Sequence, residues 1–348
     1  MKVCTSVLFL LILSQSTISL GQARKDTVTV IGVGDIMMGS NYENGILPAE
    51  NGAGLMKDVE DILNNAEVTF GNLEGVLLNE GGKPKTCRDP KVCYVFRSPV
   101  TYVQNLVRSG FDIMSIANNH AGDFGDLGRK STMETLGEAG ISYAGQLQKP
   151  WTLIERNGIK YGLVAFAPNS NCLNLNDSTE AKRLVEHVDS LADIVIVSFH
   201  GGAEGPQYQH VVRQTELFHG ENRGNVYQFA HQMIDAGADI LLGHGPHHTR
   251  GVEVYKNRFI SYSMGNFCTY GMNITGVNGL APIVKVFTTP KGVFLQAHIT
   301  STDQSARTKV KIDVERRVLQ RIQQLTREDF PETNLTISDD GWIRNSTR

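Results

Sequence analysis

Short apolar runs alternate with segments of helical periodicity from residue 26 onward, which predicts alternating strands and helices. In the first two thirds, the runs that predict strands lie at 27–33, 68–70, 113–116, 194–199 and 240–242. The segments that predict helices lie at 55–63, 98–107, 127–139, 181–191 and 226–236. Two pairs of apolar runs, 151–156 with 159–165 and 251–255 with 258–262, are each joined by two residues and predict β-hairpins.

After Gly279 the apolar runs follow one another without helices between them. Strands are predicted at 283–288, 293–299 and 309–314, followed by a helix at 315–325 and a polar tail. Mixed segments followed by consecutive strands favour the α/β class, with stacked sheets and flanking helices in one domain. We assign residues 22–300 to this domain and residues 301–348 to a C-terminal extension of one strand, one helix and the polar tail.

The first residues have the pattern of a secretory signal. Lys2 precedes an apolar run at 3–13, and a polar stretch of small residues follows, in which Ser19 and Gly21 suit the positions before cleavage. We therefore expect residues 1–21 to be a signal peptide and the protein to be exported to the periplasm, the cell surface or the medium. The alternative is an uncleaved anchor, although the run is shorter than the roughly 20 apolar residues that span a bilayer.

Composition narrows the choice of partners. The 348 residues include 33 Lys+Arg and 36 Asp+Glu, a formal net charge of -3, and 41% are hydrophobic, as in a globular protein. A near-neutral chain has no bulk charge with which to bind nucleic acid, so no nucleic-acid partner is expected. Cys87 and Cys93 are six residues apart, which favours a local disulfide in an oxidising compartment.

Five predicted strands end at side chains that bind metals, each beside glycine: Asp35, Glu74, Asn119 with His120, His200, and His244 with His247. In α/β sheets, ligand sites form outside the carboxyl ends of strands. Carboxylates and imidazoles together suit divalent Mn, Fe or Zn, and this set is large enough for two ions. Two such ions can hold the attacking and leaving oxygens of a phosphoryl displacement, so the residues predict a dinuclear metal hydrolase with phosphoester substrates.

Five motifs occur in a fixed order along the chain. They are Gly-Asp-Ile-Met at 34–37, Asn-Leu-Glu-Gly at 72–75, Asn-Asn-His-Ala-Gly-Asp-Phe-Gly at 118–125, Gly-His-Gly-Pro-His at 243–247 and Tyr-Ser-Met-Gly-Asn-Phe at 262–267. Together they resemble the CapA-like poly-γ-glutamate capsule-biosynthesis proteins over residues 28–267. That family is related to the calcineurin-like metallophosphoesterases, so the resemblance implies a four-layer α/β/β/α sandwich with a two-metal site.

The resemblance also implies roles for individual residues. Asp35, Asn119, His200, His244 and His247 match metal ligands, and His120 matches the residue that stabilises or protonates the leaving group. Two positions depart from the superfamily pattern: Met37 stands where a histidine is usual, and Glu74 is the nearest counterpart of a bridging aspartate. These departures leave open a single-metal site, or a site that binds without turnover.

Three further residues complete the expected site. Asp123 lies in the glycine-rich loop after His120 and is expected to act as a second catalytic residue by orienting it through a hydrogen bond. Glu204, four residues beyond His200, and Asn266, in the last motif, are expected to bind substrate. The remaining histidines of this part of the chain have no motif support and are expected to lie outside the site: His210, His219, His231 and His248.

The resemblance thus implies an exported CapA-like protein of capsule or exopolymer biosynthesis, with a divalent-metal hydrolase site that acts on phosphoester or polymer bonds. Its expected partners are an anionic polymer or phosphoester substrate and a membrane polymer-synthase complex. The alternative is a non-catalytic component of the cell envelope that binds the polymer or a synthase partner through a degenerate metal site.

Overall fold

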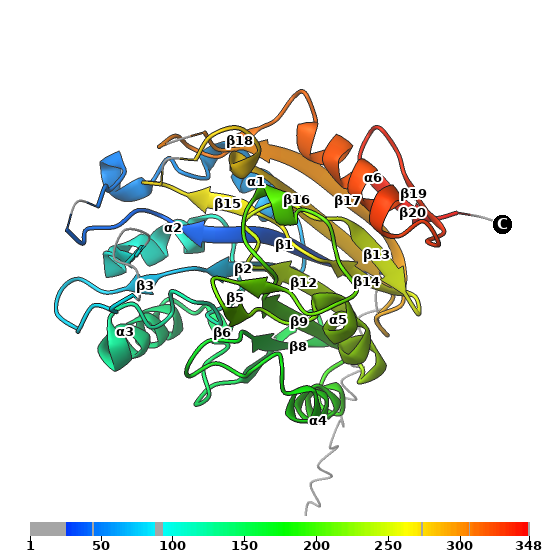
Figure 1. The fold of residues 1–348 in the computed structure, drawn as a ribbon, viewed down its shortest axis with the longest axis horizontal. Coiled ribbons are helices and arrows are strands. Elements are labelled where there is room, and N and C mark those ends of the chain that lie inside the picture. Colours follow the sequence, from blue (N-terminus) through cyan, green and yellow to red (C-terminus); the bar gives the residue numbers. More distant parts are fainter. Residues whose placement is uncertain (1–25, 44, 88–92, 273, 306, 347–348) are drawn as a thin grey trace, which may run out of the picture.

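Two β-sheets pack face to face, with helices on their outer faces (Figure 1). The structure is a computed structural model that describes residues 26–43, 45–87, 93–272, 274–305 and 307–346. The four layers confirm the α/β/β/α sandwich that the resemblance implied. The predicted signal peptide at 1–21 lies outside the described residues. Within them, no helix combines the length and the apolar content needed to cross a bilayer.

The larger sheet has β1 (Val28–Met37) near its centre. Its spatial order is β19 (Leu335–Ile337), β20 (Trp342–Asn345), β17 (Phe294–Asp303), β16 (Leu280–Thr288), β1, β2 (Val68–Leu73), β5 (Ile113–Ser115) and β6 (Ser142–Ala144). Two short strands join it, β15 (Asn266–Thr269) on β1 and β18 (Lys311–Ile312) on β17. β1, β2, β5 and β6 are parallel, whereas β16 and β17 are antiparallel to their neighbours.

The smaller sheet is built around four parallel strands, with an antiparallel strand at each edge. Its spatial order is β13 (Val252–Tyr255), β14 (Arg258–Ser261), β12 (Ile240–His244), β9 (Ile194–His200), β8 (Ile159–Phe166) and β7 (Trp151–Arg156). Both predicted hairpins, β7–β8 and β13–β14, are confirmed. Two further pairs lie in loops: β3 (Val76–Leu77) with β4 (Arg97–Ser98), and β10 (Leu217–Phe218) with β11 (Glu221–Asn222).

Alternation of side chains along the strands builds three hydrophobic layers. On β1, Val30 faces the core between the sheets, whereas Ile31 faces the outer helices. The helices α1 (Glu60–Leu63), α2 (Val103–Arg108) and α3 (Gly125–Glu138) lie outside the larger sheet. The helices α4 (Ser178–Asp189) and α5 (Val226–Asp235) lie outside the smaller sheet. This buried scaffold holds the strand ends in fixed positions.

The C-terminal part belongs to the same core. Helix α6 (Arg317–Asp329) adds Val318, Leu319 and Ile322 to the cluster between the sheets. The sequence predicted a polar tail after this helix; in the structure this polar segment contains β19 and β20, which form a hairpin that pairs with β17. The reason is that Ile343 is fully buried against the core, so a few apolar residues fix an otherwise polar segment. The assigned boundary at residue 300 falls inside β17.

Two other predicted elements are shorter than expected. The helix predicted at 55–63 is a 3-10 turn over Lys57–Val59 followed by the four-residue α1. The strand predicted at 309–314 is reduced to the two-residue β18. In both places the buried apolar side chains are present, for example Val59 and Val310, but they anchor turns instead of regular elements.

Candidate metal centre

The site lies where the carboxyl ends of strands from both sheets meet. β1 and β2 lead to Asp35 and Glu74, while β9 and β12 end at His200 and His244. A close backbone approach brings β15 against the end of β1: the Asp35 N–H donates to the Gly265 carbonyl at 2.8 Å. A Cβ at Gly34 would lie 2.1 Å from that same oxygen, so only glycine fits there.

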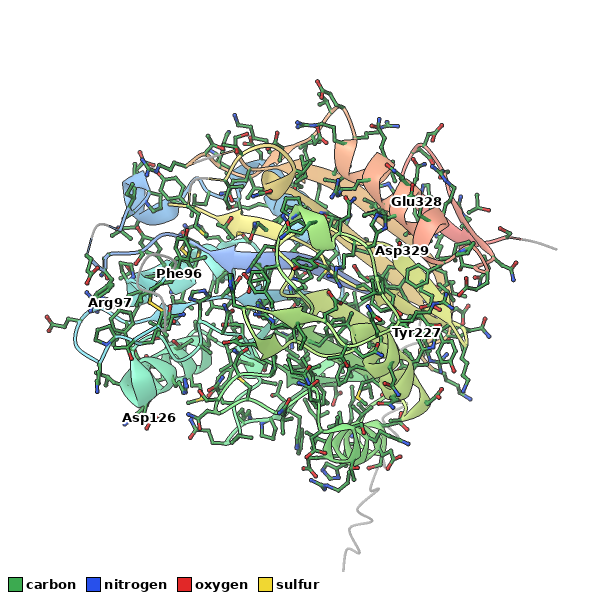
Figure 2. All side chains as sticks on the ribbon, in the orientation of Figure 1. Phe96, Arg97, Asp126, Tyr227, Glu328 and Asp329 are labelled. Atoms are coloured by element: carbon green, nitrogen blue, oxygen red, sulfur yellow. A yellow bond between two sulfur atoms is a disulfide. The ribbon has the colours of Figure 1, made fainter. Side chains whose placement is uncertain are left out.

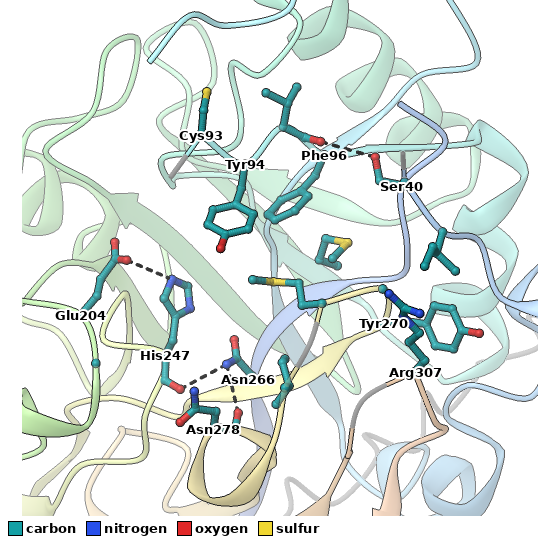
Figure 3. A pocket seen from close by; sticks show the side chains of 18 of the residues that line it. Ser40, Cys93, Tyr94, Phe96, Glu204, His247, Asn266, Tyr270, Asn278 and Arg307 are labelled. Carbon is teal, nitrogen blue, oxygen red and sulfur yellow. Dashed lines mark hydrogen bonds and ion pairs between the residues drawn. The ribbon is translucent and has the colours of Figure 1, made fainter. Parts of the chain in front are cut away.

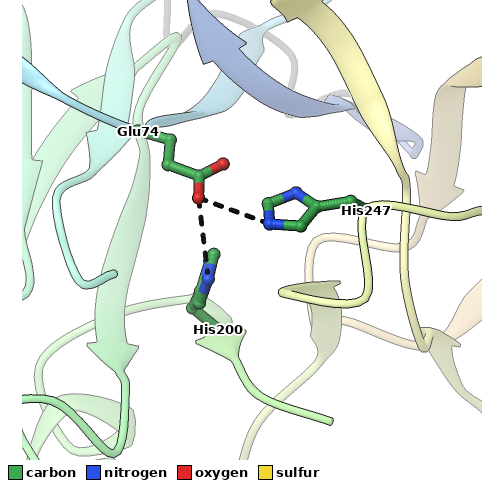
Figure 4. Close-up of side chains that lie close together, drawn as sticks. All are labelled: Glu74, His200 and His247. Carbon is green, nitrogen blue, oxygen red and sulfur yellow. Dashed lines mark ion pairs between the residues drawn. The ribbon is translucent and has the colours of Figure 1, made fainter. Parts of the chain in front are cut away.

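Glu74, His200 and His247 form the centre of the site (Figure 4). The Oε1 atom of Glu74 lies 3.6 Å from His247 Nε2 and 3.9 Å from His200 Nε2. These separations are too long for hydrogen bonds, but they suit ligands that are each about 2 Å from one shared ion. Within the part of the chain that the structure describes, this is the one group of such side chains with metal-binding geometry.

Several buried polar atoms around this centre have no hydrogen-bond partner among the described residues. They are Glu74 Oε1, both ring nitrogens of His200 and His244 Nε2; Asn119 Oδ1, next to His120 in the sequence, also lacks a partner in the described chain. Buried polar atoms are almost always paired, because leaving one unpaired costs about 1–3 kcal/mol. A cation would satisfy carboxylate, imidazole and amide atoms together, so the residues present fit a divalent metal ion.

Asp35 contacts both histidines of the motif at 243–247, His244 and His247. Its Oδ1 atom lies 3.0 Å from His244 Nδ1 and accepts a 2.8 Å hydrogen bond from Asn72 Nδ2, while its Oδ2 atom lies 3.0 Å from His247 Nδ1. Although burial opposes ionisation, both imidazoles hold the pKa of Asp35 well below its ordinary value. The ionised carboxylate fixes both rings through Nδ1, so that the Nε2 atoms remain available.

Burial and neighbouring charges shift the pKa values of the side chains at the centre. Burial raises the pKa of Glu74 to about 8, against the opposing effect of the His247 ring. Burial opposes the charged form of His247, but Glu74 and Asp35 outweigh it and raise the pKa of His247 to about 10. Burial also lowers the pKa of His200 well below its usual range. At neutral pH, His200 is therefore a neutral imidazole, the form that binds metals.

His120 lies beside the centre, and Asp123 contacts its ring on the side away from Glu74. Its Nε2 atom lies 4.0 Å from Glu74 Oε1, and its Nδ1 atom lies 2.8 Å from Asp123 Oδ2, the contact that the sequence predicted. Lys85 Nζ approaches the same carboxylate at 2.6 Å and His120 Nδ1 at 3.1 Å. Phe96 packs on the ring, with centroids 4.2 Å apart. Burial lowers the pKa of His120.

The predicted disulfide between Cys87 and Cys93 is confirmed. It lies between Lys85 and Phe96, the two residues that contact His120 or its partner Asp123 from this loop. The backbone N–H of Phe96 also donates to Asp123 Oδ2 at 2.6 Å. The disulfide loop therefore supports one side of the site, and Cys93 lines the pocket in front of it.

A pocket of about 950 Å³ opens in front of His247 (Figure 3). Glu204, Asn266 and Met37 line it together with aromatic side chains that include Tyr94 and Phe96. Asn266 Nδ2 donates to the carbonyls of Asn278, at 3.0 Å, and His247, at 3.3 Å, and so fixes the loop that carries this histidine. Met37, where the superfamily has histidine, is buried, and its Sδ accepts from the Gly39 N–H at 3.2 Å.

Of the four histidines that the sequence predicted to lie outside the site, two have structural partners. His210 Nδ1 lies 2.7 Å from Asp329, at the end of α6 (Figure 2), and His231 lies 2.9 Å from Glu253. His219 and His248, in contrast, line the pocket, although no motif marks them.

The sequence did not point to three residues of the site: Asn72, Lys85 and Arg223. Asn72 belongs to the motif at 72–75, so its place in a motif was a signal. The only feature of the sequence that could have pointed to Lys85 is its position two residues before Cys87. Arg223 Nη1 donates to Glu204 Oε1 at 2.9 Å, and no local pattern marks it.

The stacked sheets, with carboxylate and imidazole side chains at their converging strand ends, form the four-layer α/β/β/α class of fold that the resemblance implied. Within this class, residues 29–270 match the family model described as "Bacterial capsule synthesis protein PGA_cap". The chain belongs to this family, as the resemblance of its motifs predicted.

Two curated relatives are named for capsule or PGA biosynthesis. "Capsule biosynthesis protein CapA" of Bacillus anthracis is 29% identical over 261 residues, which cover 70% of this chain and 60% of that protein. "PGA biosynthesis protein CapA" of Bacillus subtilis (strain 168) is 25% identical over 258 residues, which cover 70% of this chain and 63% of that protein. The chain thus spans less than two thirds of the length of either relative.

Among solved structures, a hypothetical protein from Thermus thermophilus matches with a TM-score of 0.49 and 16% identity, over 79% of this chain and 99% of that one. A likeness of this size supports no argument about activity.

Proposed function

We propose that this chain is a divalent-metal hydrolase of the cell envelope that acts in capsule or exopolymer biosynthesis, on phosphoester or polymer bonds. The observation that carries the proposal is the centre formed by Glu74, His200 and His247, in which Glu74 Oε1 lies 3.6–3.9 Å from the two facing Nε2 atoms. Glu74 Oε1 and His200 Nε2 are buried without a hydrogen-bond partner in the described chain. Membership in the capsule synthesis family gives the biological setting.

Glu74, His200 and His247 would hold a first ion, and Asp35, Asn119 and His244 are the further residues available for a second. A divalent ion there supplies Lewis-acid chemistry: it polarises an ester or amide oxygen and makes water more acidic. The choice among Mn, Fe and Zn is consistent with mixed carboxylate and imidazole ligands.

The other residues would bind and orient the substrate and move a proton. Asp35 keeps the rings of His244 and His247 in place through their Nδ1 atoms. Asp123 does the same for His120, so that His120 Nε2 faces the centre and can carry the proton that the leaving group needs. Substrate would enter through the pocket lined by Glu204 and Asn266.

Export to the envelope is part of the proposal. It is supported by the signal-like pattern at 1–21 and by the Cys87–Cys93 disulfide, because disulfides persist in oxidising compartments. The proposed partners are an anionic polymer or phosphoester substrate and a membrane polymer-synthase complex, in line with the relatives' names.

A second candidate is a non-catalytic envelope component that holds the polymer or a synthase partner through a degenerate metal site. The buried Met37 favours it, because a thioether replaces an imidazole beside Asp35.

Aryl-phosphate hydrolysis with added Mn²⁺, Fe²⁺ or Zn²⁺ separates the two candidates. The hydrolase predicts metal-dependent turnover that is lost in His120→Ala while metal content is retained. The non-catalytic component predicts metal binding without turnover, and Met37→His should then gain activity.

A further inference from the structure

Arg223 is a buried arginine of which only part is paired. Its side chain is 2% exposed, and it follows β11 in the loop that leads to α5. Nη1 donates to Glu204 Oε1 at 2.9 Å, but Nε and Nη2 have no hydrogen-bond partner anywhere in the described chain. These two atoms form one edge of the guanidinium, the edge that binds a carboxylate or phosphate through two parallel hydrogen bonds.

A second buried arginine, Arg250, is paired more completely than Arg223. Arg250 is fully buried, and its two Nη atoms donate to the two oxygens of Glu216 at 2.8 and 2.7 Å. Nη2 also donates to the Tyr208 carbonyl at 2.7 Å, so that of Arg250 only Nε lacks a partner among the described residues. Arg250 therefore forms a structural ion pair with Glu216, whereas Nε and Nη2 of Arg223 have no partner in the described chain.

The Arg223 guanidinium is connected to the pocket through Glu204. Glu204, its partner, lines the pocket, and Glu204 Oε2 lies 4.0 Å from His247 Nε2. The charge of Arg223 also acts on the centre: burial raises the pKa of Glu74 and lowers that of His200, and Arg223 opposes the first shift and adds to the second. A free cationic edge next to a candidate metal centre is suited to an anionic group that also contacts that centre.

We propose that Arg223 is a substrate-binding residue that holds an oxyanion, a phosphoryl or carboxylate group, against the Glu74–His200–His247 centre through Nε and Nη2. The inference rests on the proposed function for its substrate but makes its own claim about anion binding. Glu204 is then a positioning residue: it occupies Nη1 and fixes the plane of the guanidinium, so that the opposite edge is presented in one orientation.

Calorimetric titration with inorganic phosphate and, separately, with acetate tests the proposal on protein with and without Mn²⁺. Arg223→Met should weaken binding of at least one anion by about tenfold or more, because it removes a charge-assisted bidentate contact. Arg223→Lys keeps the positive charge but cannot form two parallel hydrogen bonds, so it should also weaken anion binding. This variant tests the proposal if Arg223→Met does not fold. Arg213→Met, which removes an exposed arginine, is the matched control and should bind like the wild type.

An effect on phosphate alone identifies a phosphoryl group, and an effect on acetate alone identifies a carboxylate. Unchanged affinity for both anions in Arg223→Met and Arg223→Lys, or no binding of either anion by the wild type, overturns the proposal. Metal content, measured separately on each variant, keeps the two claims apart. If anion binding depends on Arg223 but the protein binds no metal, the proposed hydrolase function is contradicted and the role of Arg223 in anion binding is supported.

Discussion

At the residue scale, one carboxylate organises the candidate centre. Asp35 is completely buried and contacts His244, His247 and Asn72. An ionised carboxylate has no proton to give, so both imidazoles must donate from Nδ1. Their Nε2 atoms are thereby left as acceptors for a cation. The expected role of Asp35 as a direct ligand stays a prediction, while its contacts in this structure are those of a positioning residue.

Asp35→Asn should therefore weaken metal binding. The amide can accept on one atom only and donates from the other, so one of the two rings loses its partner. Loss of such an orienting contact lowers metal affinity by about 10–100-fold. Calorimetric titration with Mn²⁺ measures the effect, and Asp61→Asn, an exposed aspartate on α1, serves as the control. Equal affinity in Asp35→Asn and the wild type would show that the carboxylate plays no part.

Metal affinity should also rise with pH. Glu74 and Asp35 raise the pKa of His247 to about 10 against the effect of burial, and burial raises the pKa of Glu74 to about 8. Between pH 6 and 8 an ion must therefore displace a proton from both side chains, which corresponds to an affinity gain of up to about a hundredfold per pH unit in this window. Titrations in buffers of different ionisation enthalpy count the released protons. An affinity independent of pH would mean that His247 is not a ligand.

At the element scale, the disulfide loop fixes the residues behind His120. The Cys87–Cys93 bridge lies between Lys85 and Phe96, and closing so short a loop restricts the unfolded chain. Cys87→Ala/Cys93→Ala should lower the free energy of unfolding by about 2 kcal/mol in urea. A reducing agent should lower the stability of the wild type to the same level and leave the double variant unchanged. If the reduced and oxidised wild type unfold alike, the bridge does not stabilise the fold.

The C-terminal hairpin is the second element with a measurable contribution. Ile343 on β20 is fully buried, and its backbone pairs with Ala297 on β17. Ile343→Ala should therefore destabilise the whole domain by about 2–5 kcal/mol through lost burial and a residual cavity. Arg344→Ala, exposed on the same strand, should cost far less. A small effect of Ile343→Ala in urea unfolding would indicate that residues 335–345 are an appendage.

At the scale of the whole molecule, the fold class could be predicted from the sequence, because the apolar side chains that become buried recur with the period of a strand or of a helix. The strands β9 and β12 are apolar along their length and end at His200 and His244. Both the position of these strands and the candidate ligands at their ends could therefore be predicted from the sequence. The C-terminal hairpin was not, because its apolar residues are few and become buried only when β17 is in place.

The centre was predictable only in part, for a related reason. Glu74 and the histidines follow strand ends, and a motif marked each of them except His200. Arg223 reaches Glu204 across 19 residues and the β10–β11 hairpin, and Lys85 reaches Asp123 across the fold. Such contacts form only in the tertiary structure, so they cannot be predicted from a local sequence pattern. The sequence predicted two ions, whereas the geometry of the described residues brings together one group of three ligands.

Metal analysis of the purified protein tests the central claim most directly. His200 is buried with both ring nitrogens unpaired within the described chain, so His200→Ala removes a proposed ligand without breaking a hydrogen bond. After loading with Mn²⁺, Fe²⁺ or Zn²⁺ and dialysis, the wild type should retain at least one ion per chain, and His200→Ala should lose it while keeping the wild-type circular dichroism spectrum. A wild type that retains no ion, or a His200→Ala variant that retains as much as the wild type, would contradict the account.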